Sequence, residues 1–286
     1  MKLMAPDYYP AFRCIAGACR HTCCAGWEID VDAASLEEYR TLTGELGARM
    51  ARSLCEDEDG AHFRLTQDER CPFLNGDGLC DLIIGLGEEH LCQICADHPR
   101  FRSELSDRTE IGLGLCCEAA AALILGREEK TALITLMDDG QPEELWPEDA
   151  EVLEFRDRLI ALAQDRTMSV TARVDAIMKA ADIATPKRTP AEWADVNLAL
   201  ERLDTAWDDC LARLRIAAPA PVGSEWDTPF EQLLVCLLFR HVTGAAEDGD
   251  LAGRTAFAVL SWQIIRELFA REDIPSIAAL AELARL

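Results

Sequence analysis

The sequence lacks any long apolar segment. No unbroken apolar run exceeds seven residues, the length of Leu233–Phe239, whereas a helix needs about 20 apolar residues to cross a bilayer. The first ten residues also lack the apolar stretch of a secretory signal. We therefore expect a soluble, cytoplasmic protein with no membrane partner, in a compartment where thiols stay reduced.

Positive charge is scarce. The chain has 28 lysines and arginines against 52 aspartates and glutamates, and its formal net charge is −24. A surface of this sign repels the phosphates of nucleic acids, so we expect no nucleic-acid partner. It attracts a lysine-bearing protein and speeds the encounter. Solubility alone is the other reading of the same charge.

Cysteine is scarce in the second half of the chain and concentrated in the first. Beyond residue 117 there are only Cys210 and Cys236, on apolar stretches that predict core positions. Cysteines at short spacings either form disulfides or bind metal. A reducing compartment and an odd total of 13 favour metal. The other eleven are Cys14, Cys19, Cys23, Cys24, Cys55, Cys71, Cys80, Cys92, Cys95, Cys116 and Cys117.

The spacing of these cysteines predicts several ligand loops. Cys92-x2-Cys95 is the tightest pair, a spacing that lets both thiolates bind one metal. Between Cys71 and Cys80, two glycines allow the chain to turn back sharply. All-sulfur ligation suits zinc and iron–sulfur clusters alike, so the pattern predicts a metal centre without identifying the metal.

The composition changes near residue 126 and predicts two domains. Residues 1–126 read as a cysteine-rich metal-binding module, and residues 127–286 as a helical domain packed against it. The predicted fold is mostly α, with short strands in the module. In the module we expect helices over 35–53 and 117–125 and strands over 28–31, 62–65 and 110–113. In the second domain, apolar spacing and cap signals predict helices over 145–164, 169–183, 190–216, 228–242, 251–270 and 275–285.

Two common cofactor-binding motifs are missing. A Rossmann-type site needs a glycine-rich loop between a strand and a helix, and Gly85-Leu86-Gly87 lacks that context. A Cys-x3-Cys-x2-Cys signature is also absent, because Gly26 stands where the third cysteine would follow Cys19 and Cys23. Neither kind of cofactor site is therefore expected.

Residues around the cysteines match a known family. They are Tyr8, Tyr9, Phe12 and Cys14; Ala16, Gly17, Cys19, Thr22, Cys23, Cys24, Gly26 and Trp27; Asp30 or Asp32; Cys71, Pro72, Phe73, Leu74, Gly78, Leu79 and Cys80; Leu86, Gly87 and Glu88; Leu91, Cys92, Cys95, His98, Pro99 and Arg100; and Leu115, Cys116, Glu118, Ala119 and Ala120. With them the chain resembles the flagellin lysine-N-methylase family, which is related to small cysteine-cluster proteins that chelate zinc or iron. Later segments such as Phe230–Val235 and Phe257–Val259 are similar more loosely.

The resemblance implies a protein-lysine N-methyltransferase. Its methyl donor would be S-adenosylmethionine, and its substrate would be flagellin or a similar surface protein. Its cofactor would be an iron–sulfur cluster, expected as 4Fe–4S, and zinc is the alternative metal. The chain departs from the family by its shorter length and by an additional cysteine, Cys117. The alternative function is a non-enzymatic zinc-, iron- or cluster-binding protein. The implied ligands are Cys14, Cys19, Cys23, Cys24, Cys71, Cys80, Cys92, Cys95 and Cys116.

Four other residues are candidates for binding or catalysis. Trp27 could stack on the donor's adenine, although covering the cluster or packing in the core is its more usual role. Arg100 could hold a carboxylate through its forked guanidinium, or form an ion pair at a structural turn. Asp30 and Asp32 could receive the substrate lysine, which must be neutral to attack a methyl group, or cap the helix that follows them.

Overall fold

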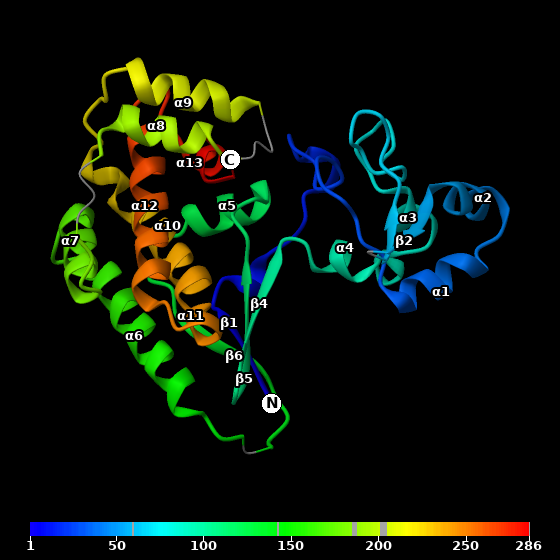
Figure 1. Cartoon of the computed structure of the whole chain (residues 1–286), viewed down its shortest axis with the longest axis horizontal. Coiled ribbons are helices and arrows are strands. Elements are labelled where there is room, and N and C mark those ends of the chain that lie inside the picture. The colour runs from blue at the N-terminus through cyan, green and yellow to red at the C-terminus, as the bar shows by residue number, and fades with distance from the viewer. Residues whose placement is uncertain (59, 142, 185–187, 201–204, 286) are drawn as a thin grey trace. The chain divides into compact units, whose positions relative to one another are not determined.

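The computed structural model describes residues 1–58, 60–141, 143–184, 188–200 and 205–285. The chain divides into two compact units (Figure 1). One, which we call the cysteine-bearing unit, is Cys14–Pro99. The other, which we call the helical unit, joins Met1–Arg13 to Arg100–Leu286. This division differs from the boundary predicted at residue 126. The cysteine-bearing unit is an insertion, and the chain's first residues belong with its last.

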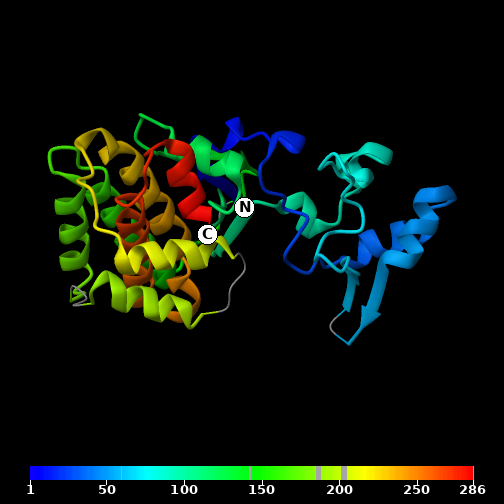
Figure 2. The same cartoon turned by 90° about the horizontal axis from the view of Figure 1, so that it is seen from above.

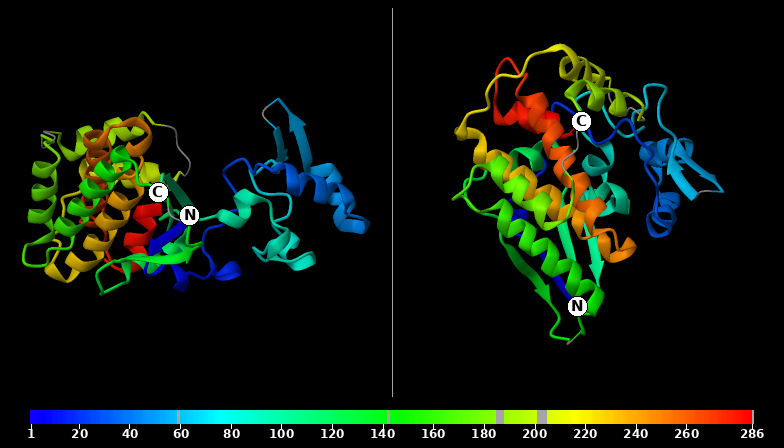
Figure 3. Two further views of the ribbon diagram at one scale, coloured as in Figure 1. Left: turned by 90° about the horizontal axis from the view of Figure 1, so that it is seen from below. Right: turned by 60° about the vertical axis from the view of Figure 1, so that its left-hand side comes forward.

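A four-stranded sheet explains why the first residues of the chain belong with the segment that follows residue 99. Its order is β4-β5-β1-β6, so the N-terminal strand lies inside the sheet (Figure 3). Lys2 of β1 is in register with Arg108 of the parallel β5 and with Asp138 of the antiparallel β6. Strand pairing thereby joins segments more than 100 residues apart. The strands are β1 (Lys2–Pro6), β4 (Arg100–Leu105), β5 (Arg108–Leu113) and β6 (Leu133–Asp138).

Helices form most of the helical unit, which confirms the prediction of a mostly α protein. Figure 2 shows them gathered on one side of the strands. Among the described residues, no helix combines the length and apolar character needed to cross a membrane. The helices are α5 (Glu118–Leu125), α6 (Pro147–Ala163), α7 (Val170–Ala180), α8 (Pro190–Leu198), α9 (Ala206–Ile216), α10 (Asp227–Val242), α11 (Ala245–Asp248), α12 (Leu251–Phe269) and α13 (Ile277–Arg285).

Helix α10 is the centre of this unit. It packs against α5, α6 and α12, and every residue from Phe230 to Phe239 is buried. A helix surrounded in this way is apolar around its whole circumference rather than on one face. Its few polar side chains must therefore find partners inside the protein.

Buried charges on α10 are paired. Glu231 is fully buried, and its carboxylate accepts hydrogen bonds from Arg166 at 2.9 Å and from the nearly buried Arg173 at 2.6 Å. A similar buried pair joins Arg156 of α6 to Glu110 of β5. Because an unpaired buried charge is costly, these contacts fix which helix faces meet.

The cysteine-bearing unit is smaller and less regular. Its hydrophobic core contains Tyr39, Met50, Phe63, Phe73 and Leu82, and the rings of Phe63 and Phe73 lie 5.1 Å apart. The unit contains α1 (Ala33–Thr41), α2 (Gly44–Ser53), β2 (Leu54–Asp57), β3 (Gly60–Phe63), α3 (Asp81–Gly85) and α4 (Gln93–Asp97), and β2 pairs with β3.

Several predicted elements are wrong in detail. The helix predicted over 35–53 is two helices, because Leu42 and Thr43 are extended and Gly44 has a positive φ of 73°. Residues 28–31 form only an isolated bridge, between Asp30 and His62. The segment 190–216 forms α8 and α9, and residues 201–204 lie outside the described part of the chain.

We predict that Glu231→Gln lowers the free energy of unfolding of the helical unit by about 3 kcal/mol, because it leaves the Arg173 guanidinium buried without a counter-charge. Asp195→Asn is the matched control. Its partner Arg215 is 45% exposed and Asp195 itself 56% exposed, so we expect a change within about 0.5 kcal/mol. Urea unfolding followed by tryptophan fluorescence measures both. Equal changes in the free energy of unfolding for Glu231→Gln and Asp195→Asn would contradict a structural role for the buried pair of Glu231 and Arg173.

Candidate metal centre

The thiols lie in the core of the cysteine-bearing unit. All 13 cysteines are described and are free thiols. Cys71 and Cys92 are buried, at 5% and 0% exposure. Cys24, Cys80 and Cys95 pack against the same hydrophobic core, partly buried. Five thiols from three chain segments therefore converge on one small core.

Backbone pairing brings the first cysteine loop to the second. The N–H of Cys71 donates to the carbonyl oxygen of Cys24 at 2.7 Å, and that of Gly26 donates to Glu69 at 2.9 Å. Ala25 and Arg70 form a bridge between the two. These contacts hold Cys24 beside Cys71 although 46 positions separate them (71 − 24 − 1).

The loop between Cys71 and Cys80 is closed by its own polar groups. The Asn75 side-chain oxygen accepts hydrogen bonds from the N–H groups of Asp77 and Leu79, both at 3.0 Å. Gly78 has a φ of 73°, which a residue with a Cβ rarely adopts. Leu74 then bridges Cys80, so the turn brings the two cysteines of this loop back to the same core.

Contacts with helix α1 fix the third loop. Cys92 precedes the first residue of α4, and its carbonyl oxygen accepts from the N–H of Ala96. The Gln93 N–H donates to the carboxylate of Asp32 at 2.8 Å. The Tyr39 hydroxyl donates to the carbonyl oxygen of His90 at 2.7 Å. The loop is thereby positioned with its two thiols toward the core.

The thiols are close enough to change one another's ionisation. The hydrogen bond that Cys95 donates to Cys92 lowers the pKa of Cys92 and raises that of Cys95. A second such bond, from Cys23, lowers the pKa of Cys24 to about 7. Burial raises the pKa of Cys71 to about 12, and the neighbouring Cys24, Cys80 and Cys92 act in the same direction.

The donor set therefore suits a thiolate-bound metal in its chemistry, and hydrogen bonds join two pairs of these thiols, Cys23 with Cys24 and Cys95 with Cys92. Across the described residues, no group of three or more His, Cys, Asp or Glu side chains is arranged to hold a metal ion. A metal that bound here would replace the thiol protons that now join Cys23 to Cys24 and Cys92 to Cys95.

The remaining predicted ligands lie outside this core. Cys14 is exposed, and it acts on the pKa of Cys23. Cys19 is half-buried. Cys116 is exposed and, with Cys117, belongs to the helical unit. Their part in metal binding stays a prediction.

Three cysteines were predicted to lie outside any metal site. Cys210 and Cys236 are buried in the helical unit. Cys55 lies in β2, where its sulfur accepts a hydrogen bond from Arg64 at 3.2 Å.

The two candidate aspartates have different surroundings. Asp32 caps α1 by accepting from the N–H of Ser35 at 3.0 Å, and its other oxygen accepts from the Ser35 hydroxyl and from Gln93. The backbone N–H groups of Gln93 and Ser35 lower the pKa of Asp32, so it is a weak proton acceptor. Asp30 is exposed. A role in receiving the substrate lysine remains a prediction for both.

Trp27 and Arg100 belong to different units. Trp27 is half-buried, donates its indole N–H to the carbonyl oxygen of Cys23 at 2.8 Å, and stacks on His98. Arg100 donates to the Tyr9 hydroxyl at 2.9 Å and lies over the Phe12 ring. These contacts give both side chains packing roles. Thr22 belongs to the cysteine motif, but no role was predicted for it from the sequence; its hydroxyl accepts a hydrogen bond from the N–H of Cys24 at 3.1 Å.

Part of the chain is similar to proteins from Salmonella. It is 25% identical over 134 residues to the lysine-N-methylases of Salmonella typhimurium and Salmonella choleraesuis, a match that covers 45% of this chain and 33% of each relative. It is 26% identical over 140 residues to the flagellar biosynthetic protein FliU of Salmonella muenchen, covering 45% of this chain and 79% of FliU. The match thus spans about a third of the length of the two methylases.

These similarities confirm the resemblance seen in the cysteine motifs. They support a relationship between this chain and the flagellin lysine-N-methylase family. No family model and no solved structure matches the chain.

We predict that in the reduced, metal-free protein Cys24 is alkylated by iodoacetamide with a midpoint near pH 7, because the hydrogen bond from Cys23 stabilises its thiolate. Cys71, with a pKa near 12, should stay protonated and unreactive at that pH. Cys23→Ala should move the midpoint of Cys24 toward the ordinary value of 9.0. Peptide mass spectrometry follows each site, and an unchanged midpoint in Cys23→Ala would refute the assigned cause.

Proposed function

We propose that this chain is an S-adenosylmethionine-dependent protein-lysine N-methyltransferase. Its substrate would be flagellin or a similar surface protein, and an iron–sulfur cluster would be held by the N-terminal cysteines. The observation that carries the proposal is the similarity to the Salmonella lysine-N-methylases. The similarity to FliU, a flagellar biosynthetic protein, supports a flagellar substrate.

The reaction sets clear demands on the protein. The lysine nitrogen attacks the methyl carbon with its lone pair while the carbon–sulfur bond of the sulfonium breaks. The products are methyl-lysine and S-adenosylhomocysteine. Because lysine is protonated at neutral pH, it must first give up a proton. The net charge of −24 favours encounter with a lysine-bearing partner.

The thiols that we propose as the principal cluster ligands are those that share one core: Cys24, Cys71, Cys80, Cys92 and Cys95. They come from three loops, which is how thiolate-bound clusters are usually held. Five thiolates also exceed the four that a structural zinc ion uses. A cluster bound here would supply Lewis-acid or electron-transfer chemistry and would tie the three loops together.

The alternative function is a non-enzymatic protein that binds zinc, iron or a cluster. The same convergence of thiols favours it, since nine of the cysteines fall within one compact unit. The two functions differ in what they ask of the helical unit, because a metal carrier has no need of a protein-substrate site.

We predict that protein purified without oxygen is brown, with broad absorption near about 400 nm from sulfide-to-iron charge transfer. Cys92→Ala should lose the colour and the iron. Cys210→Ala is the matched control, since Cys210 is also buried, at 4%, but lies in the other unit. It should keep both. Colourless protein with stoichiometric zinc and no sulfide would rule out the cluster.

We predict that the cluster-loaded protein, incubated without oxygen with S-adenosylmethionine and the flagellin from its own genome, produces methyl-lysine. Cys92→Ala should be inactive, and Cys210→Ala should retain activity. Mass spectrometry of the flagellin peptides is the measurement. If fully loaded protein leaves flagellin and other lysine-rich proteins unmodified, the non-enzymatic function replaces this one.

A further inference from the structure

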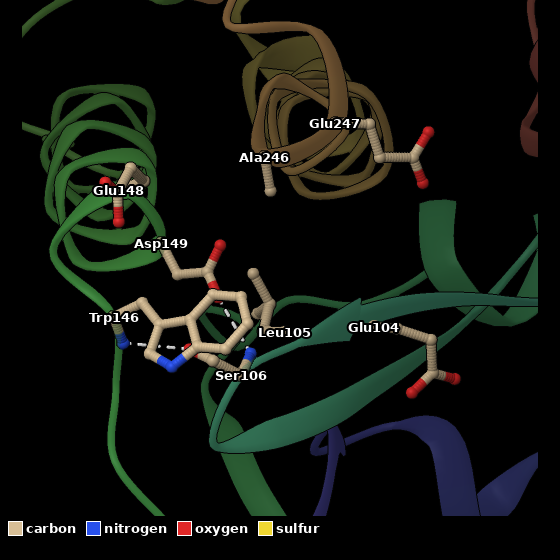
Figure 4. Close-up of a pocket in the computed structure, with 8 residues that line it drawn as sticks. All are labelled: Glu104, Leu105, Ser106, Trp146, Glu148, Asp149, Ala246 and Glu247. Atoms are coloured by element: carbon tan, nitrogen blue, oxygen red, sulfur yellow. Dashed lines mark hydrogen bonds between the residues drawn. The ribbon is translucent and has the colours of Figure 1, made fainter.

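The helical unit has an open cavity of about 610 Å³ that the proposed reaction does not use. Figure 4 shows where it lies, between the turn that joins β4 to β5, the start of α6 and helix α11. Its lining contains no lysine, arginine or histidine. The lining residues are Glu104, Leu105, Ser106, Trp146, Glu148, Asp149, Ala246 and Glu247.

Two hydrogen bonds hold this site together. The N–H of Trp146 donates to the Ser106 hydroxyl at 2.9 Å. The N–H of Ser106 donates to the Oδ2 atom of Asp149 at 2.7 Å. The strand turn is thereby joined to the first turn of α6, and the Asp149 carboxylate and the backbone of Trp146 are both held to Ser106 (Figure 4).

Asp149 is a buried carboxylate with a free oxygen. Its side chain is among the buried polar groups, at 8% exposure. Oδ2 is occupied by Ser106, whereas Oδ1 accepts no hydrogen bond from any described residue. In Figure 4 this second oxygen points into the space beneath Ala246. A buried carboxylate oxygen that faces a cavity attracts a cationic hydrogen-bond donor.

Trp146 supplies an aromatic wall next to that carboxylate. It is 62% exposed, unusual for so large an apolar side chain, and it lines the cavity. The face of an indole ring attracts ammonium and guanidinium groups. Its area also suits the methylene chain of a long cationic side chain.

The other acidic side chains add to the negative charge of the cavity. Glu148 and Asp149 stand in the first turn of α6, where carboxylates also stabilise the positive helix end. Glu247 likewise stands in the first turn of α11, and Glu104, from β4, accepts a hydrogen bond from the Thr109 hydroxyl at 2.6 Å. Within the described parts of the chain, none of the four forms an ion pair with a basic residue.

We propose that this cavity binds a lysine side chain of a protein partner. The methylene chain lies along the Trp146 indole, and the ammonium group donates to Oδ1 of Asp149. The compact ammonium can direct one N–H to a single free oxygen, whereas the two-pronged guanidinium of arginine favours a carboxylate with both oxygens available. The partner is the lysine-bearing protein substrate, and for its identity the inference rests on the proposed function. The cavity is a docking site for that substrate.

The test measures peptide binding to this cavity and needs no S-adenosylmethionine, no iron–sulfur cluster and no methyl transfer. The probe is a capped five-residue peptide with one central lysine among alanines, titrated at low salt into the full chain. The Trp146 indole N–H resonance, assigned by its loss in Trp146→Ala, should shift with the lysine peptide. It should not shift with the same peptide carrying norleucine, which has the chain without the charge. Added salt should weaken the binding.

Two variants and a control separate the contributions. Trp146→Ala should raise the Kd about threefold to fivefold, the size of an exposed cation–π contact. Asp149→Asn, which keeps the shape of the side chain, should raise it about tenfold, as expected for loss of a charged hydrogen bond. Glu154→Gln removes the same charge from an exposed position on α6 outside the cavity and should leave the Kd unchanged.

The outcomes distinguish this proposal from the proposed function. An unmoved Trp146 resonance, or equal affinities for the Asp149→Asn and Glu154→Gln variants, would overturn the docking site even if the protein methylates flagellin. Tighter binding of the same peptide with arginine in place of the central lysine would overturn the choice of lysine. Peptide binding with these variant effects supports the docking site even if methylation fails.

Discussion

The position of strand β1 is the constraint on which the organisation of the chain depends. Because β1 lies between β5 and β6, Lys2–Pro6 must pair with strands that lie between residues 108 and 138 before the sheet of the helical unit is complete. Everything between Arg13 and Arg100 is then an insertion whose two ends belong to the same unit. The insertion has its own core and carries nine of the cysteines. The thiol chemistry is thus separated from the apolar packing around α10, and each unit depends on its own interactions.

Within the insertion, the core and the thiols are the same structure. Cys71 and Cys92 are buried beside Phe73 and Leu82, and backbone contacts fix the three loops that carry the cysteines. Hydrogen bonds join Cys23 to Cys24 and Cys92 to Cys95. Metal binding in such a unit is coupled to loss of these protons and to small movements of the loops.

In the helical unit, charge has two separate uses. Inside, Glu231 and Glu110 are neutralised by arginines and determine which elements pack together. Around Trp146, four carboxylates line one cavity, and within the described parts of the chain none of them forms an ion pair with a basic residue. The overall excess of acid acts at long range on any basic protein, whereas the aromatic wall and the free oxygen of Asp149 act only on contact. Attraction and recognition therefore come from different features of the same unit.

The sequence by itself determined the helical class, most helices of the second half, the reduced thiols and the resemblance that the comparisons support, because helix periodicity and cysteine spacing are local signals. It did not determine the two-unit division, since strand pairing across 100 residues leaves no local signal. The sequence pattern also predicted one helix over residues 35–53, where the structure has two helices that are separated just before Gly44, a residue with a positive φ. Which thiols converge was decided by the Cys24–Cys71 backbone pairing. The cavity beside Trp146 arose only where β4, α6 and α11 meet, and such a meeting of distant segments is a property of the tertiary structure alone.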